Sequence, residues 1–283
     1  MGDLWYDKHN MLAHVSLRRA KRREITMIQK RDILFTPAGE MRTLHIYLPD
    51  DYAYSSEHYP VMYFFDGHNL FFNHDATYGK SWGLKEFMDQ WEKKMIIVGV
   101  TCSMTNRLVE YCPYHFTKGF LGEIVGTGEE TLRWMVEELK PVIDRDYRTM
   151  PFRECTAIGG ASMGGLMSLY AAIKYNRWFS KAACLSSTTG PCMEDFRRDL
   201  DETEMFADTR VYLSWGTEEG GGSKLYPRSD TNDTMAGRNG ELAARISEKG
   251  CLTRIYGQPG GHHCEADWEK QVPMFMDFLW MNR

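Results

Sequence analysis

This sequence of 283 residues lacks three features: Cys-x-x-Cys pairs, long apolar runs and a net positive charge. The seven cysteines are scattered without a Cys-x-x-Cys pair, a pattern typical of reduced thiols in a cytoplasm. No run approaches the roughly 20 apolar residues that span a bilayer, and the charged N-terminus lacks the apolar core of a secretory signal. The net charge of −5 leaves no basic excess to neutralise phosphates. We therefore expect a cytoplasmic protein whose partner is neither a membrane nor a nucleic acid.

Low-complexity linkers and internal repeats are also missing, so the sequence marks no domain boundary. A hydrophobic share of 43% with 26% charged residues is ordinary for a globular protein, and a chain of this length can bury one substantial core. We predict a single domain over residues 1–283, in which residues 1–23 form a basic N-terminal extension. The glycine-rich stretch that begins at Glu218 is short for a linker, and we expect a mobile loop from there to Asn232.

What the sequence does contain is an alternation of short apolar runs with longer segments of helical period. Since parallel strands need crossover connections, this alternation predicts an α/β fold with a mostly parallel, eight-stranded sheet and helices on both faces. The turn residues Thr36–Gly39 predict an antiparallel hairpin at the start of the sheet. Strands are expected at Glu24–Gln29, Thr43–Leu48, Val61–Phe65, Met95–Thr101, Thr156–Ile158, Lys181–Leu185, Arg210–Trp215 and Thr253–Tyr256, and helices at Trp82–Lys93, Glu129–Asp144, Gly165–Asn176, Met235–Lys249 and Ala266–Met281.

The most informative stretch runs from Cys155 to Tyr170. It combines a short apolar strand, a glycine-rich turn that carries Ser162, and an amphipathic helix. Gly160 and Gly164 leave room for a strained backbone that projects the serine hydroxyl beyond the sheet edge. This Gly-x-Ser-x-Gly pattern is the nucleophile elbow of a serine hydrolase, and its strand–turn–helix context separates it from an accidental glycine turn.

A serine hydroxyl needs a histidine to take its proton, and the histidine needs a carboxylate to fix its tautomer. Only two of the nine histidines follow Ser162 in the sequence, namely His262 and His263. Both lie between the last predicted strand and the last predicted helix, at the sheet edge where α/β folds place their sites. The run His-His-Cys-Glu could also ligate a metal ion, but adjacent side chains diverge and no second ligand set follows, so we expect no metal.

The acid is expected in the loop after the strand Arg210–Trp215. Glu218 and Glu219 are adjacent candidates there, and Asp230 and Asp233 remain alternatives if the loop folds back. One of the two glutamates must be an ordinary solvated side chain.

The oxyanion of an acyl-transfer reaction needs two preorganised donors. One is expected to be the backbone N–H of Met163, the residue after the nucleophile. The other is expected from the loop after the third strand, where Gly67 allows the backbone to approach the substrate. The side chain of His68 is an alternative donor, although a backbone role is favoured.

These residues carry a family resemblance that extends from about Thr43 to the C-terminus. The chain resembles the putative esterase family of α/β-hydrolases, which includes enterochelin esterases, feruloyl and acetylxylan esterases, S-formylglutathione hydrolase and mycolyltransferases. The motifs that match in order are Asp66-Gly-His-Asn-Leu-Phe71, Arg107-Leu-Val-Glu-Tyr-Cys-Pro113, Glu138-Leu-Lys-Pro141, Tyr147-Arg-Thr149, Gly160-Ala-Ser-Met-Gly-Gly165, Gly216-Thr-Glu-Glu219 and His263-Cys-Glu-Ala-Asp-Trp268.

The resemblance implies an α/β-hydrolase fold and assigns roles within it. It makes Ser162 the nucleophile, His263 the base in preference to His262, and Glu219 the acid, although a glutamate beside another glutamate keeps Glu218 open. It implies that the N–H of His68 is the second oxyanion donor. It also implies a buried ion pair between Arg107 and Glu110 that supports the site.

The predicted function is a serine carboxylesterase that needs no cofactor and acts on a small-molecule ester, such as an acylated sugar, an aromatic-acid ester or a siderophore-type ester. An acyltransferase using the same acyl-enzyme is the nearest alternative, and a non-catalytic binding module or a peptidase is less well supported. Aromatic side chains in or near predicted loops could contact an acyl group or a sugar, although most are expected in the core: Phe71, Phe72, Tyr78, Trp82, Tyr111 and Phe116.

Overall fold

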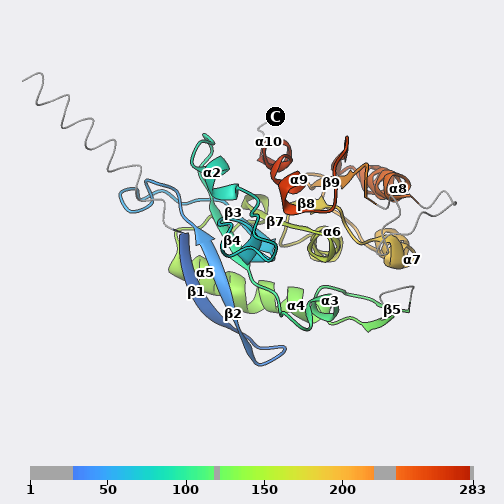
Figure 1. The fold of residues 1–283 in the computed structure, drawn as a ribbon, viewed down its shortest axis with the longest axis horizontal. Coiled ribbons are helices and arrows are strands. Elements are labelled where there is room, and N and C mark those ends of the chain that lie inside the picture. The colour runs from blue at the N-terminus through green and yellow to red at the C-terminus, as the bar shows by residue number, and fades with distance from the viewer. Residues whose placement is uncertain (1–27, 118–121, 220–233, 281–283) are drawn as a thin grey trace, which may run out of the picture.

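The computed structural model describes residues 28–117, 122–219 and 234–280, and an eight-stranded sheet forms its centre (Figure 1). The strand order is β1-β2-β4-β3-β7-β8-β9-β10. Strands β3, β4, β7, β8, β9 and β10 are parallel to one another, whereas β2 pairs antiparallel with both β1 and β4. The predicted fold class is therefore confirmed. The strand bounds are β1 (Ile28–Phe35), β2 (Glu40–Tyr47), β3 (Val61–Phe65), β4 (Ile96–Val100), β7 (Thr156–Ala161), β8 (Lys181–Leu185), β9 (Arg210–Gly216) and β10 (Leu252–Gln258).

Helices cover both faces of the sheet. The helices are α2 (Leu84–Met88), α3 (Arg107–Glu110), α4 (Gly128–Trp134), α5 (Lys140–Asp146), α6 (Met163–Lys174), α7 (Met193–Glu202), α8 (Met235–Glu248), α9 (Glu265–Glu269) and α10 (Val272–Trp280). A π-helical turn, η3 (Met135–Leu139), joins α4 to α5, and single 3₁₀ turns lie at η1 (Gly67–Asn69), η4 (Arg153–Cys155) and η5 (Gly190–Cys192). A separate two-stranded hairpin consists of β5 (His115–Thr117) and β6 (Glu123–Val125).

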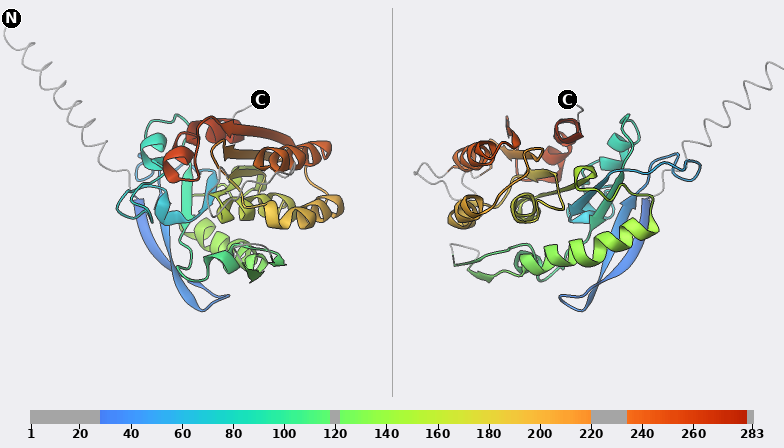
Figure 2. Two further views of the ribbon diagram at one scale, coloured as in Figure 1. Left: turned by 45° about the vertical axis from the view of Figure 1, so that its right-hand side comes forward. Right: turned by 180° about the vertical axis from the view of Figure 1, so that it is seen from behind.

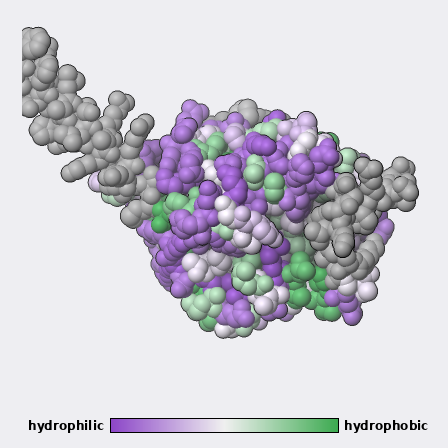
Figure 3. Space-filling view, viewed as in Figure 1, coloured by the Kyte–Doolittle hydropathy of each residue, from purple (hydrophilic) through white to green (hydrophobic). Residues whose placement is uncertain are grey.

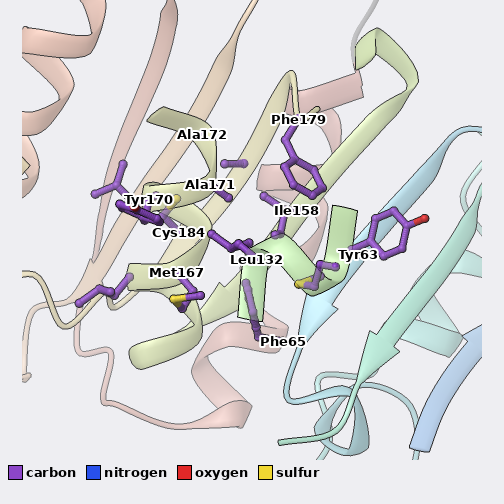
Figure 4. Close-up of a cluster of buried hydrophobic side chains, with 14 of the residues drawn as sticks. Tyr63, Phe65, Leu132, Ile158, Met167, Tyr170, Ala171, Ala172, Phe179 and Cys184 are labelled. Atoms are coloured by element: carbon purple, nitrogen blue, oxygen red, sulfur yellow. The ribbon is translucent and has the colours of Figure 1, made fainter. Parts of the chain in front are cut away.

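Two apolar cores result because successive strand residues point to opposite faces. In β3, Tyr63 and Phe65 pack with α4, α5, α6, α7 and α8, whereas Met62 and Phe64 pack with α2, α9 and α10. Figure 4 shows part of the first core, where Phe65 lies near Leu132 of α4 and Met167 of α6. The ring of Tyr63 meets that of Phe179, with centroids 6.3 Å apart. Every residue of β3 is buried, as expected for a strand at the centre of a sheet covered on both sides.

The N-terminal hairpin curls away from the rest of the sheet and is supported by the α4–α5 rod (Figure 2). The indole of Trp134 donates a hydrogen bond to the carbonyl of Leu34 at 3.0 Å, and its ring meets the edge of Phe35. Gly39 has φ +66° in the connecting turn, which explains why a glycine ends the run from Thr36. The predicted antiparallel hairpin is thus confirmed.

Several element bounds differ from the sequence prediction. The first strand was expected at Glu24–Gln29, but β1 begins at Ile28 within the described residues and continues to Phe35. Its alternation of partly buried and exposed residues hid it from a search for apolar runs. The last helix was expected as one segment, but Pro273 near the start of α10 would clash with the carbonyl of Glu269, so α9 ends there. Helix α7 and the β5–β6 hairpin were not predicted.

The surface seen in Figure 3 is mostly hydrophilic, with a small apolar group over the region of α3 and β5. Val125 is 60% exposed and Leu108 is 40% exposed in this part of the chain. No helix among the described residues is long and apolar enough to cross a membrane. The expected N-terminal extension, residues 1–23, and most of the expected loop to Asn232 lie outside the described residues.

Candidate functional site

Ser162 lies at the junction between β7 and α6 with φ 60° and ψ −120°, a conformation that non-glycine residues rarely adopt. The glycines around it are required by space. A Cβ on Gly160 would lie 2.7 Å from the carbonyl carbon of Gly164, and a Cβ on Gly164 would lie 2.9 Å from the Cβ of Phe65. The amide of Leu166 donates to the carbonyl of Ser162 at 3.0 Å, which begins the helix directly after the turn. The strand–turn–helix predicted around Ser162 is therefore present.

The loop after β8 holds this elbow in place. The amide of Ser162 donates to the carbonyl of Leu185 at 2.9 Å, and the amide of Thr188 donates to the carbonyl of Ser162 at 3.2 Å. The hydroxyls of Ser162 and Thr188 are 3.5 Å apart, which is long for a hydrogen bond between hydroxyls. Thr188 therefore constrains the side chain of Ser162 only weakly.

His263 and Glu219 form a close pair on the loops after β10 and β9. Nδ1 of His263 lies 2.9 Å from Oε2 of Glu219. The carboxylate of Glu219 is 1% exposed, whereas the imidazole is 25% exposed. The other oxygen, Oε1, accepts hydrogen bonds from the hydroxyl of Ser186 at 2.6 Å and from the amide of Gly216 at 2.7 Å. Three donors thus surround the Glu219 carboxylate and hold both of its oxygens in place.

Two of the alternatives considered for these positions, Glu218 and His262, are less suitable. Glu218 is exposed to solvent. The imidazole of His262 is 68% exposed, and its Nδ1 lies 3.6 Å from Oδ2 of Asp267. Asp230 and Asp233 lie outside the described residues. Within those residues, no group of three or more His, Cys, Asp and Glu side chains is arranged to hold a metal ion.

The two backbone amides predicted as oxyanion donors belong to Met163 and His68. Among the described residues, neither the N–H of Met163 nor that of His68 donates a hydrogen bond. Met163 is the first residue of α6, so its amide has no acceptor within the helix. His68 lies in η1, and Gly67 before it packs so closely on β4 that a Cβ there would lie 2.2 Å from the carbonyl carbon of Gly99. Only glycine fits at that position.

The imidazole of His68 is occupied elsewhere, which favours the backbone role. Its Nε2 lies 2.9 Å from the hydroxyl of Thr77, and burial lowers the pKa of this histidine. The side chain of His68 is thus engaged with Thr77, whereas its backbone amide donates no hydrogen bond among the described residues.

The predicted ion pair between Arg107 and Glu110 is wrong. Nε and Nη2 of Arg107 each donate to the carboxylate of Asp66 at 2.8 Å, while Glu110 accepts from Nη2 of Arg42 at 2.7 Å. Arg107 and Glu110 start and end the short helix α3, and sequence spacing does not show that they face different partners. Asp66 has φ 56°, and Arg107 and the hydroxyl of Tyr111 hold it in that conformation. Arg107 therefore supports the loop that carries His68.

Three further residues of this region were not assigned by sequence reasoning. Ser186 and Trp268 adjoin the His263–Glu219 pair, and the indole N–H of Trp268 donates to the hydroxyl of Ser186 at 2.9 Å. Glu265 is 5% exposed, and burial raises the pKa of its carboxyl group. Trp268 ends the His-x-Glu-x-x-Trp pattern, so its position could have been noted, but nothing in the sequence distinguishes Ser186 from other serines.

Comparison with known proteins agrees with this geometry. The model of the putative esterase family matches residues 37–278. The uncharacterized protein YbbA of Bacillus subtilis (strain 168) is 27% identical over 187 residues, which are 63% of this chain and 69% of YbbA. An endo-1,4-beta-xylanase/feruloyl esterase of Xylanibacter ruminicola is 27% identical over 156 residues, which are 53% of this chain and 20% of that protein.

A solved structure shows the same fold. The siderophore hydrolase EstA from Aspergillus nidulans superposes with a TM-score of 0.66 at 18% identity, covering 89% of this chain and 94% of EstA. The match to the family extends over most of the described residues, including the elbow and the loops after β9 and β10. The chain therefore belongs to the putative esterase family and is, by class, a serine ester hydrolase.

Proposed function

We propose that the protein is a carboxylesterase that works through an acyl-enzyme, with Ser162, His263 and Glu219 as its catalytic triad. The observation that carries this proposal is the 2.9 Å contact between Nδ1 of His263 and Oε2 of Glu219, whose side chain is 1% exposed. The nucleophile elbow lies at the same edge of the sheet, because β7 and β10 are parallel strands that end there.

The tautomer of His263 follows from its partner. A carboxylate only accepts hydrogen bonds, so Nδ1 carries the proton of the neutral imidazole and Nε2 is the nitrogen that can take another. His263 would remove the proton of Ser162 as Oγ attacks the ester carbonyl. Glu219 would stabilise the resulting imidazolium, and the amides of Met163 and His68 would hold the oxyanion.

Collapse of the tetrahedral intermediate completes the first half of the reaction. The bond to the alcohol breaks, and His263 returns its proton to the departing oxygen, which leaves Ser162 acylated. Water then attacks the acyl-enzyme with His263 again as the base, and the carboxylic acid is released. In this proposed mechanism, every proton transfer passes through Nε2 of His263.

For the substrate, we propose a small aromatic-acid or siderophore-type ester. The similarity to a feruloyl esterase and to a siderophore hydrolase supports this class. Most of the rings considered as substrate contacts belong to the core, since Phe71, Trp82, Tyr111 and Phe116 are at most 7% exposed. Tyr78, at 81% exposed, is the ring of that set most accessible to a ligand.

Two organisational predictions also remain proposals, namely a single domain over residues 1–283 and a cytoplasmic location. None of the seven cysteines, all of which lie among the described residues, forms a disulfide. The single domain is tested by limited proteolysis, and a stable fragment shorter than the sheet-forming region would contradict it. The cytoplasmic location is tested by cell fractionation, and recovery of the protein outside the cytoplasm would contradict it.

The proposed activity is tested by hydrolysis of p-nitrophenyl acetate, butyrate and octanoate beside methyl ferulate, using wild type and Ser162→Ala. We expect turnover by the wild type that is lost in the variant, and covalent labelling of Ser162 by a fluorophosphonate. Analysis of the products with added alcohol separates hydrolysis from acyl transfer. Wild-type protein that neither turns over an ester nor reacts with the fluorophosphonate would overturn the proposal.

A further inference from the structure

We propose that Ser186 and Trp268 are positioning residues that fix the orientation of Glu219 toward His263. This proposal rests on the proposed function, because it assigns Glu219 and His263 to the triad. Ser186 follows β8 directly, and Trp268 lies on α9, five residues after His263. We refer to this pair of residues as the clamp.

The direction of the hydrogen bonds in the clamp is fixed by chemistry. The indole N–H of Trp268 can only donate, so the hydroxyl of Ser186 accepts it at 2.9 Å. A serine hydroxyl has one proton, and Oε1 of Glu219, 2.6 Å away, can only accept. Trp268 therefore directs the single proton of Ser186 to Glu219.

The consequence for Glu219 is that its two oxygens have different partners. Oε1 accepts from Ser186 and from the amide of Gly216, which leaves Oε2 for His263. The terminal torsion of a glutamate is broad and roughly two-fold, so covalent geometry alone does not hold one oxygen toward the histidine. The donors on Oε1 supply that restraint.

Backbone strain at Ser186 points to the same conclusion. Ser186 has φ 46°, is 1% exposed, and donates its amide to the carbonyl of Ser214 at 2.8 Å. A glycine would adopt this conformation without strain, yet it would offer no hydroxyl. Strained residues of this kind persist where the surrounding contacts determine them and are frequent at functional sites.

Trp268 also contacts the base directly. Its ring meets that of His263 edge to face, with centroids 5.1 Å apart and an interplanar angle of 83°. One side chain thus packs against the histidine and, through Ser186, restrains the acid. The clamp holds both members of the pair in one relative geometry.

The experiment compares Ser186→Ala, Ser186→Gly, Trp268→Phe and the double variant Ser186→Ala/Trp268→Phe with wild type. Phenylalanine keeps a ring against His263 but removes the N–H. Trp82→Phe is the matched control, since Trp82 is a buried tryptophan of the same core and its ring centroid lies 5.7 Å from that of Trp268. The readouts are kcat and KM for p-nitrophenyl acetate, and the rate constant for labelling of Ser162 by a fluorophosphonate.

We expect Ser186→Ala to lower kcat and the labelling rate about 10- to 100-fold with KM within two-fold, because a hydrogen bond to a charged group is lost. Ser186→Gly should lower kcat and the labelling rate by as much, although glycine relieves the backbone strain and should fold at least as well. Trp268→Phe should lower kcat and the labelling rate about three- to ten-fold. The double variant should be no slower than Ser186→Ala, since Trp268 acts through Ser186. Trp82→Phe should stay within two-fold of wild type.

Retention of the wild-type labelling rate in Ser186→Ala, recovery of activity in Ser186→Gly, or multiplied losses in the double variant would each overturn the clamp. A separate readout keeps the clamp testable even if the esterase proposal fails. The proton on Nδ1 of His263 gives a downfield NMR resonance while it is held by Glu219. We expect this resonance in wild type and Trp82→Phe and its loss in Ser186→Ala, and its persistence in Ser186→Ala would contradict the proposal.

Discussion

The two halves of the candidate site are built in different ways. The elbow around Ser162 is contiguous in sequence and depends on space, since Gly160 and Gly164 allow a backbone path that a methyl group would block. The acid–base half draws Ser186, Glu219 and His263 from the loops after three different strands and depends on hydrogen bonds between side chains. Activity should be lost at the elbow when a substitution adds volume. It should be lost at the acid–base half when a substitution removes a hydrogen-bond donor or acceptor. The following predictions test this contrast.

The largest effect is expected at the nucleophile. Ser162→Ala should lower kcat about 10⁴- to 10⁶-fold, because the acyl-enzyme can no longer form. Thr188→Val is the matched control for the nearby hydroxyl, and its 3.5 Å contact predicts a change of only a few-fold. A Thr188→Val loss comparable to that of Ser162→Ala would contradict the weak role given to this threonine, and steady-state hydrolysis of p-nitrophenyl acetate makes the measurement.

The next effect is expected at the acid. Glu219→Gln should lower kcat about 10²- to 10⁴-fold, because an amide cannot stabilise the imidazolium and can hold the wrong tautomer of His263. Glu218→Gln changes an exposed neighbour in the same loop and should stay within two-fold of wild type. The same assay decides between the two glutamates, and the reverse ranking would move the triad acid to Glu218.

The elbow is tested by adding volume. Gly160→Ala should lower the free energy of unfolding by about 1–3 kcal/mol and abolish most activity, since the new methyl group would lie 2.7 Å from the backbone of Gly164. Gly240→Ala is the control, because this glycine lies within α8 and a Cβ there meets nothing within 4 Å. It should stabilise the protein by about 0.5–1 kcal/mol. Urea unfolding of both variants measures the difference, and equal destabilisation would break the contrast.

The smallest effect concerns Glu265, a second buried carboxyl group in the acid–base half. Burial raises the pKa of Glu265, so the native state binds this proton more tightly than the unfolded state does. Its contribution to stability is fully present below the unfolded value of 4.5 and is lost as pH rises through the higher folded value. Glu265→Gln should therefore raise Tm by a few degrees at pH 8 and leave it nearly unchanged at pH 4.

Thermal unfolding of Glu265→Gln and Glu218→Gln across this pH range is the measurement. The exposed Glu218 should show no such pH-dependent gain. A gain for Glu265→Gln that is larger at pH 4 than at pH 8 would reverse the sign and show that the carboxylate of Glu265 is stabilised in the folded protein.

The same contrast explains what the sequence could predict. The strand, turn and helix of the elbow were predicted because they are local, although β7 continues to Ala161 and α6 begins at Met163. Strand β3 was predicted with its observed bounds because it is uniformly apolar. The partner of Arg107 was predicted wrongly, since spacing along α3 does not reveal that Asp66 lies across from it. Ser186 could not have been found, because its role exists only where the loops after β8 and β9 meet Trp268. Hydrogen bonds between distant segments leave no local pattern.

The order of these segments also has a consequence for synthesis. His263 follows Ser162 by 101 residues (263 − 162), and Trp268 comes later still. At about 5–20 residues per second, a ribosome delivers the base roughly 5–20 s after the nucleophile. The central strands β3, β4, β7 and β8 can form in that interval, yet the nascent chain carries a serine without its base. If the proposed triad is correct, hydrolytic activity arises only with the last part of the chain, because a translation product that stops at the end of β9 lacks both Glu219 and His263.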